Sequence, residues 1–121
     1  MKIALATSGN ELSSVLDARF GRAPYFLVVD LDNDNVTAHT NQQNLEAAQG
    51  AGIQAAQNVA ALKVDALVAC NVGPKAFRVF QHAGIPVYLC KGDCSAADAI
   101  KAFKAGELQK ADGANVMGHW A

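Results

Sequence analysis

Short apolar runs, each closed by turn-forming residues, divide this chain into alternating segments. The runs are too short for helices and are typical of buried strands. One of them, residues 36–40, is polar at alternate positions, which indicates a strand near an edge of the sheet. The pattern predicts strands at residues 2–7, 25–31, 36–40, 66–70 and 85–90. The segment Asp32-Asn33-Asp34-Asn35 has the composition of a hairpin turn between the second and third strands.

Three longer segments repeat apolar residues at helical spacing. The first covers residues 49–62. The second begins at Pro74, because proline fits the first turn of a helix, and ends at Gly84, a residue that favours a helix C-terminus. The third covers residues 96–105, with Ser95 as its expected N-cap. One helical turn is expected near residues 12–16, and the tail at about 108–121 shows no clear period.

The order of these elements predicts a single-domain α/β protein, residues 1–121, with a mixed five-stranded sheet flanked by helices. Helix and strand alternate in the second half, which favours parallel strands joined by right-handed crossovers. The hairpin in the first half adds an antiparallel element. We expect the first strand to be central, with the hairpin on one side and the later strands on the other. The tail is expected to be flexible or loosely docked.

Composition and charge exclude several classes of function. Hydrophobic residues make up 51% of the 121 positions and charged residues 17%, which is typical of a globular chain. Ten Lys and Arg against 11 Asp and Glu give a net charge of −1, without the basic face that a duplex nucleic-acid binder needs. The apolar runs are too short for a signal peptide or for the ~20 residues of a membrane span. We therefore expect a cytoplasmic protein whose three cysteines are thiols, with no nucleic-acid or membrane partner.

Candidate chemistry begins at Arg19-Phe20-Gly21-Arg22-Ala23-Pro24-Tyr25-Phe26, which leads directly into a predicted strand. Two arginines alternate there with aromatic residues. The planar guanidinium group suits anions that offer several acceptor oxygens or sulfurs. Arg19 and Arg22 therefore form an anion site if their side chains converge. The alternative is a pair of solvated loop arginines beside core aromatic residues, since exposed arginine is common.

Ligands of an open sheet of this type bind beyond the carboxyl ends of its parallel strands. The strands that end near Thr7, Cys70 and Cys90 are expected to share that edge. The polar residues that follow them are candidate ligand-binding groups, namely Ser8, Asn71 and Lys91. The helices that begin at Pro74 and after Ser95 would add backbone N–H groups and helix dipoles that favour anions. The sequence thus predicts an electropositive rim with few carboxylates.

The three cysteines are a second candidate feature. Cys70 and Cys90 end two strands that are expected to be neighbours, and Cys94 lies four residues after Cys90. Thiolates are soft ligands for Cu(I), zinc or sulfide clusters, so all three are candidate metal ligands. The alternative is that each is a small buried hydrophobic residue. The C-x3-C spacing without a second pair is a weak signal for zinc.

Catalytic motifs are not visible in the sequence. His119, beside Trp120 in the tail, is the histidine that we expect to reach a bound ligand. A two-metal nuclease needs clustered carboxylates, and Asp30 is the only acid on a predicted strand. Thiol redox enzymes usually carry C-x-x-C, which Cys90 and Cys94 do not form. Nuclease and redox functions are therefore the weaker alternatives.

Taken together, the motifs resemble the dinitrogenase iron–molybdenum cofactor biosynthesis family, of the NifX and NifB C-terminal type. The resemblance covers nearly the whole chain and rests on residues 2–7, 19–26, Asp30, 50–56, 73–76, 83–87 and 106–108. It implies a ribonuclease H-like α/β fold with a mixed five-stranded sheet. The stand-alone size is similar to that of the orange-protein branch, which is associated with molybdenum–copper sulfide clusters.

The resemblance also implies a function. Family members bind, carry or store anionic metal–sulfur clusters and are not themselves catalysts. The expected ligand here is a molybdenum-containing metal–sulfide cluster. The sequence does not decide whether its second metal is copper or iron, or whether it is an iron–molybdenum cofactor precursor. Many members carry His where this chain has Arg19, so charge pairing from Arg19 and Arg22 is expected in place of metal ligation at position 19. A protein that donates or accepts the cluster is the expected partner. The alternative function is a regulatory or protein-interaction module without a cluster.

Overall fold

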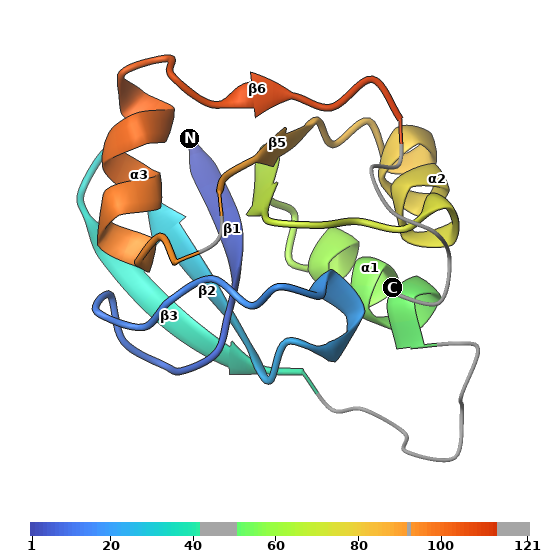
Figure 1. Ribbon diagram of the computed structural model, residues 1–121, viewed down its shortest axis with the longest axis horizontal. Coiled ribbons are helices and arrows are strands. Elements are labelled where there is room, and N and C mark those ends of the chain that lie inside the picture. Colours follow the sequence, from blue (N-terminus) through green and yellow to red (C-terminus); the bar gives the residue numbers. More distant parts are fainter. Residues whose placement is uncertain (42–50, 92, 114–121) are drawn as a thin grey trace.

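The computed structural model describes residues 1–41, 51–91 and 93–113. Within these residues, six strands form one mixed sheet in the order β3-β2-β1-β4-β5-β6 (Figure 1). The strands are β1 (Lys2–Thr7), β2 (Tyr25–Asp30), β3 (Asn35–Thr40), β4 (Ala66–Ala69), β5 (Val87–Leu89) and β6 (Gln109–Lys110). The helices are α1 (Ala51–Ala61), α2 (Pro74–Ala83) and α3 (Ala96–Lys104), with a short 3-10 helix η1 (Phe20–Arg22) between β1 and β2.

The predicted strand order is confirmed. β1 lies between β2, to which it is antiparallel, and β4, to which it is parallel. β2 and β3 form the hairpin, and β3 is a largely exposed edge strand. β5 adds a further parallel strand beside β4. Five of the six residues of β1 are buried. Because consecutive residues of a strand point to opposite faces, such a run is buried only where both faces of the sheet are covered, as they are at its centre.

The helices cover both faces of the sheet. Alternate side chains of β1 point in opposite directions, so Ala4 and Ala6 pack in the core beneath α1 and α2, whereas Ile3 and Leu5 pack in the core beneath α3. Figure 1 shows α3 separated from α1 and α2 by the strands. Small residues under α1 and α2 allow these helices to approach the strands closely. The result is a three-layer arrangement with a core on each side of the sheet.

The predicted helix boundaries are largely confirmed. α2 begins at Pro74 and is followed by Gly84 in the left-handed conformation, with φ of 72°, which glycine adopts without strain. The Ser95 hydroxyl accepts a hydrogen bond of 3.1 Å from the Asp98 N–H at the start of α3. The first helix is described from Ala51, and the predicted residues 49–50 lie outside the described part of the chain.

Two local expectations are wrong. The sheet has six strands rather than five, because part of the predicted loose tail forms β6. Lys110 pairs with Tyr88 and Gln109 with Leu89, and the Ala111 N–H donates to the Val87 carbonyl at 2.8 Å. Backbone hydrogen bonds hold β6, and its two side chains are exposed, so it leaves no apolar pattern in the sequence. The rest of the tail, residues 114–121, lies outside the described residues.

The second wrong expectation is the helical turn near residues 12–16. Leu16 pairs instead with Thr7, and Val15 pairs with Ser95, in isolated antiparallel bridges. Residues 15–17 therefore form backbone hydrogen bonds with residues 6–8 and with Cys94, whereas the Ser14 N–H donates locally to the Glu11 carbonyl at 3.0 Å in a single turn. The ribonuclease H-like motif stays a prediction. None of the helices among the described residues is long and apolar enough to cross a membrane.

Candidate functional site

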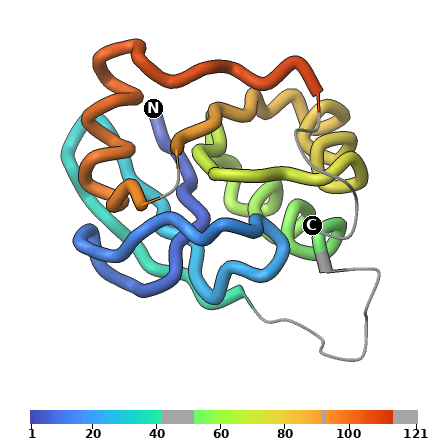
Figure 2. The backbone as a smooth tube through the Cα atoms, viewed as in Figure 1, coloured from blue at the N-terminus to red at the C-terminus, as the bar shows by residue number. Residues whose placement is uncertain are grey.

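The segment between β1 and β2 crosses the carboxyl edge of the parallel strands. In Figure 2 it is the dark blue to light blue tube that runs from beside α3 to beside α1. At one end, the N–H groups of Ala96 and Ala97 donate to the carbonyls of Ser14 and Leu12 at 2.8 and 2.9 Å. At the other end, η1 carries Phe20 into the core beneath α1. The segment therefore lies across the edge of the sheet at which the sequence predicts a bound ligand.

Phe20 anchors the predicted arginine pair. Its side chain is fully buried, stacks on Phe26 at a centroid distance of 5.5 Å, and meets Phe80 edge-on at 5.3 Å. Arg19, immediately before it, is exposed, and Arg22, two residues after it, is partly buried. The aromatic residues of the motif thus belong to the core, while both arginines remain at the surface. This arrangement agrees with the alternative of surface arginines beside core aromatic residues, and the anion site formed by Arg19 and Arg22 stays a prediction.

Two polar side chains fix the backbone around the arginines. The Asp17 carboxylate accepts a 2.9 Å hydrogen bond from the Arg19 N–H, and the Asn71 side-chain amide donates to the Ala18 carbonyl at 2.7 Å. The Phe20 N–H also donates to the Asn71 carbonyl at 3.2 Å. Asn71 follows β4, so these bonds attach residues 17–22, here called the arginine segment, to the carboxyl end of the parallel strands. The predicted candidates Asn71, Arg19 and Arg22 therefore lie in one connected region.

The guanidinium groups of Arg19 and Arg22 are not neutralised by carboxylates in the described part of the chain. No carboxylate oxygen there lies within 4.0 Å of either group, and the ion pairs that are present join Met1 to Asp32 and Lys104 to Asp34. Surface arginines without a partner carboxylate keep their charge and donors available for another anion.

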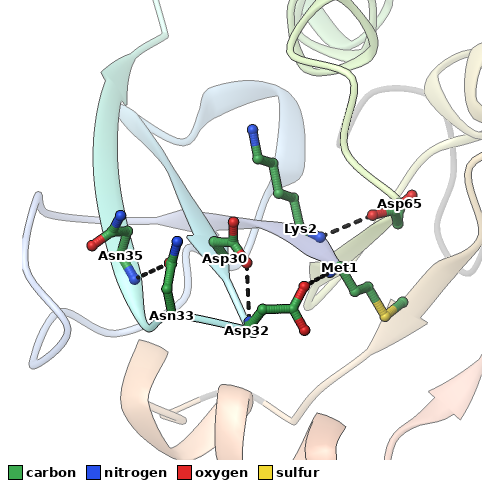
Figure 3. Close-up of polar contacts among 7 residues, drawn as sticks. All are labelled: Met1, Lys2, Asp30, Asp32, Asn33, Asn35 and Asp65. Carbon is green, nitrogen blue, oxygen red and sulfur yellow. Dashed lines mark hydrogen bonds and ion pairs between the residues drawn. The ribbon is translucent and has the colours of Figure 1, made fainter.

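Carboxylates gather instead at the opposite end of β1 (Figure 3). The Met1 ammonium group donates to Asp32 at 2.8 Å, and the Lys2 N–H donates to Asp65 at 2.9 Å. Asp30 accepts from the Asp32 N–H at 3.0 Å. Because β2 runs antiparallel to β1, it starts beside the arginine segment and ends at this acidic turn. The predicted strand acid Asp30 is therefore a structural group at the far edge.

The two predicted helix N-termini differ. In α3 the N–H groups of Ala96 and Ala97 donate to the β1–β2 segment, and that of Asp98 donates to the Ser95 hydroxyl. The expectation that this terminus offers donors to a ligand is therefore wrong. In α2 no side chain caps the N-terminus, where Gly73 precedes Pro74. The positive end of the α2 dipole thus adjoins Asn71 and the arginine segment.

The other predicted polar residues are placed less favourably. The Ser8 hydroxyl donates to the Val15 carbonyl at 3.0 Å, so its hydrogen is used within its own loop. Lys91 is exposed and follows β5. His119 lies outside the described residues. The roles of all three as ligand-binding residues stay predictions.

Cys70 is a buried thiol, 6% exposed, at the end of β4. Its Sγ lies 3.9 Å from the Lys91 carbonyl oxygen. Burial raises the pKa of Cys70 to about 11, with smaller contributions from Cys94 and the carboxylates of Asp17 and Asp93. Cys70 is therefore a protonated, weakly nucleophilic thiol at neutral pH.

Cys90 and Cys94 form a contacting pair of partly buried thiols on the α3 face of the sheet. Burial raises the pKa of Cys94 to about 12, together with a hydrogen bond between the two side chains and the charge of Cys90. Among the described residues, no three His, Cys, Asp or Glu side chains are grouped so that they could hold a metal ion. The three thiols thus do not form one ligand set, and ligation by individual cysteines stays a prediction.

Comparison with known proteins identifies the family. Residues 1–106 match the family described as dinitrogenase iron–molybdenum cofactor. The chain belongs to this family. A similar member is the uncharacterized protein MJ0580 of Methanocaldococcus jannaschii, which is 35% identical over 113 residues and 91% of each chain.

Two solved structures of similar proteins extend this result. The apo form of the orange protein from Desulfovibrio gigas superposes with a TM-score of 0.90 at 36% identity, over 95% of this chain and 96% of that chain. A putative NifB protein from Thermotoga that belongs to the DUF35 family gives a TM-score of 0.74 at 31% identity, over 90% and 91% of the two chains. The resemblance to the iron–molybdenum cofactor family, and to the orange protein within it, is confirmed. Membership indicates a cofactor-binding or carrier role.

Asp17 is a residue of the site that the sequence analysis did not single out. It precedes Arg19 by two positions, which is the spacing at which an aspartate side chain accepts from the backbone in a turn. The Asp-x-Arg pattern was thus an available signal. The Asp17 carboxylate orders the backbone that presents Arg19.

Proposed function

We propose that this member of the iron–molybdenum cofactor family binds an anionic, molybdenum-containing metal–sulfide cluster and carries it as cargo, without catalysing a reaction on it. The observation that carries the proposal is the arrangement of Arg19 and Arg22. Arg19 and Arg22 flank the buried Phe20 anchor in the sequence and lie at the surface, and no carboxylate of the described residues lies within 4.0 Å of either guanidinium group. Membership of the iron–molybdenum cofactor family supports the choice of a molybdenum-containing metal–sulfide anion.

The arginines are proposed to neutralise the cluster and to donate hydrogen bonds to its sulfides. Each guanidinium presents five N–H donors in a planar fork, which matches an anion with several acceptor atoms. Because Phe20, Asp17 and Asn71 already fix the backbone, binding orders only the two side chains. A cluster whose metals are enclosed by sulfide needs no protein ligand at position 19, so Arg19 replaces ligation with charge.

The other predicted groups have supporting roles in this proposal. The α2 N-terminus adds the positive end of a helix dipole, equivalent to roughly half an elementary charge. Lys91 adds a full charge from the end of β5. Asn71 acts mainly by holding the arginine segment, and Ser8 donates only if its bond to Val15 is broken. His119 is proposed to approach from the tail.

The cysteines are not required for this mode of recognition, because charge pairing and hydrogen bonding can hold a cluster that retains its own sulfides. Cys70, Cys90 and Cys94 are thus proposed as residues that line the edge, apart from the separate role argued below for two of them. Copper and iron both stay open as the second metal. A protein that donates or accepts the cluster is the proposed partner.

Titration of the apo protein with tetrathiomolybdate, with and without Cu(I), tests the proposal. Hydrogen bonds to charged groups contribute about 1.5–3 kcal/mol, so Arg22→Ala is expected to weaken binding by about tenfold or more. Arg22→Lys keeps the charge but loses the planar fork and is expected to recover only part of the affinity.

Arg78→Ala is the matched control. Arg78 is an exposed arginine on α2 that lines a different hollow, with Ile53, Val79 and His82. The Arg78→Ala variant loses the same charge at a position outside the arginine segment, and its affinity for tetrathiomolybdate is expected to stay within about twofold of the wild-type value. Equal losses in Arg78→Ala and Arg22→Ala would mean that only net charge matters. Wild-type affinity in both Arg19→Ala and Arg22→Ala would overturn the proposal.

A further inference from the structure

A groove of about 520 Å³ lies between β5, α3 and β6. Its walls are formed by Leu89, Cys90, Lys91, Cys94, Ala102, Glu107, Leu108 and Gln109. Neither arginine of the proposed cluster site lines it, and Cys70 does not line it. The contacting thiol pair therefore faces a hollow of its own, separate from the arginine segment.

The backbone holds both cysteines of the pair in place. The Cys90 N–H donates to the Ala69 carbonyl at 2.9 Å, which extends the β4–β5 pairing by one step. The Cys94 carbonyl accepts from the Leu16 N–H at 2.9 Å, which ties it to the β1–β2 segment. Both attachments come from outside the short connection between the two cysteines. The thiol pair is therefore positioned by the fold before any ligand binds.

Their side chains are in contact and accessible. The two thiols are neighbours on the same groove wall, and the Cys94 thiol lies 3.5 Å from the Ser95 carbonyl, a weak hydrogen bond that a better ligand can replace. Both residues are only partly buried and line the groove. Cys70, by contrast, is 6% exposed and lies outside it. The fold thus separates two reachable thiols from one enclosed thiol.

We propose that Cys90 and Cys94 form a two-thiolate site for a single Cu(I) ion on the wall of this groove. Soft thiolates select soft metals, and Cu(I) is stable with two thiolate ligands. Zn²⁺ in structural sites takes four ligands, and the described residues offer no group of three or more candidate ligands. Binding exchanges two thiol protons for one Cu⁺, which leaves a complex of net charge −1.

The surroundings of the groove suit such a complex. The ammonium group of Lys91 can offset its single negative charge, while Leu89, Ala102 and Leu108 supply an apolar lining. Glu107 contributes one carboxylate to the same groove, which is a hard ligand that Cu(I) does not prefer. This site does not depend on the cluster proposal, because it needs neither molybdenum nor the arginines.

The test is an anaerobic Cu(I) titration of the apo protein against bicinchoninate, a chromogenic Cu(I) chelator, with no molybdenum present. We expect one tightly held Cu(I) per chain. Cys90→Ser and Cys94→Ser should each weaken binding by more than about 100-fold, since losing a ligand costs more than losing a residue that only orients one. Cys70→Ser is the matched control and should bind as the wild type does.

Further arms separate this site from the cluster site and from misfolding. Arg22→Ala should keep full Cu(I) affinity, and sulfur-edge or copper-edge X-ray absorption should report two sulfur ligands. Urea unfolding of each serine variant should show that it is folded under the conditions of the titration. No tight Cu(I), wild-type affinity in the folded Cys90→Ser and Cys94→Ser variants, or an equal loss in Cys70→Ser would overturn the proposal.

Discussion

The arginine segment should depend on Phe20 more than on any polar contact around it. Phe20 is fully buried and makes two aromatic contacts, with ring centroids 5.5 and 5.3 Å away. Replacing a buried phenylalanine with alanine typically costs about 3–5 kcal/mol of stability. The two ring contacts are each worth about 0.5–1.5 kcal/mol beyond area burial, which places Phe20→Ala near the upper end of that range.

The chain should survive this loss. At about 0.05–0.15 kcal/mol per residue, a chain of this size has a free energy of unfolding of roughly 6–18 kcal/mol. A loss of about 4 kcal/mol, with a urea m-value of about 2 kcal/mol per molar, lowers the urea midpoint by about 2 M. Urea unfolding followed by circular dichroism measures this shift directly.

Phe103→Ala is the matched control for the removal of a phenyl ring. Phe103 is partly buried and makes one ring contact, with Tyr88 at 5.0 Å, on the other face of the sheet. We expect it to cost about half as much as Phe20→Ala, because less apolar area and one aromatic contact are lost. Equal or smaller destabilisation by Phe20→Ala would refute the view that Phe20 is the anchor. Phe20→Leu, at a cost of about 1.5 kcal/mol or less, should stay folded and bind tetrathiomolybdate more weakly although both arginines remain.

Three further predictions concern single contacts. Asn71→Ala removes the 2.7 Å bond to the Ala18 carbonyl and should cost about 1 kcal/mol in urea unfolding, with faster hydrogen exchange in the arginine segment than elsewhere. Ser95→Ala removes the cap that accepts from Asp98 and should cost about 1 kcal/mol, whereas Ser95→Asn should cost little; equal costs would contradict the cap. Burial raises the pKa of Cys70 from 9.0 to about 11, so folding favours its protonated form. The contribution of Cys70 to the free energy of unfolding should therefore be fully present below pH 9, and this free energy should fall by up to about 3 kcal/mol as the pH rises past 11. In Cys70→Ala, this part of the decrease at alkaline pH should be absent.

Much of the fold follows from local patterns. The buried runs of β1 and β4 are almost entirely apolar, and the turn after β2 is rich in Asp and Asn. The strands and the hairpin can therefore be predicted from the local sequence. Pro74, Gly84 and Ser95 mark helix ends because each has a specific backbone preference or capping group. Strand order then follows from the alternation of helix and strand.

The features that local patterns did not predict depend on backbone bonds between distant residues. β6 is held by carbonyl and N–H groups, which every sequence carries, and its exposed Gln and Lys give no signal. The α3 N-terminus was expected to offer donors, but residues 12–14 use the N–H groups of Ala96 and Ala97. Such a contact between residues more than 80 positions apart leaves no trace in local periodicity.

The candidate site shows the same division. Residue types alone suggested Arg19, Arg22 and Asn71 as candidates, because charge and amide chemistry are intrinsic to those side chains. How they are arranged was not visible: Asp17 and Asn71 hold the segment, and Phe20 fixes it to the core. All three cysteines pack into the cluster on the α3 face of the sheet, but Cys70 is buried whereas Cys90 and Cys94 are only partly buried, and no pattern in the sequence indicated this difference in exposure.

The most direct test of the central claim is an absorption spectrum with elemental analysis of the apo chain, before and after incubation with tetrathiomolybdate and copper and passage through a desalting column. The account predicts new charge-transfer bands, with molybdenum and sulfide retained by the wild type and by Arg78→Ala and strongly reduced in Arg22→Ala. Passage of all the molybdenum into the small-molecule fraction would contradict the cluster-carrier function and would favour a protein-interaction module.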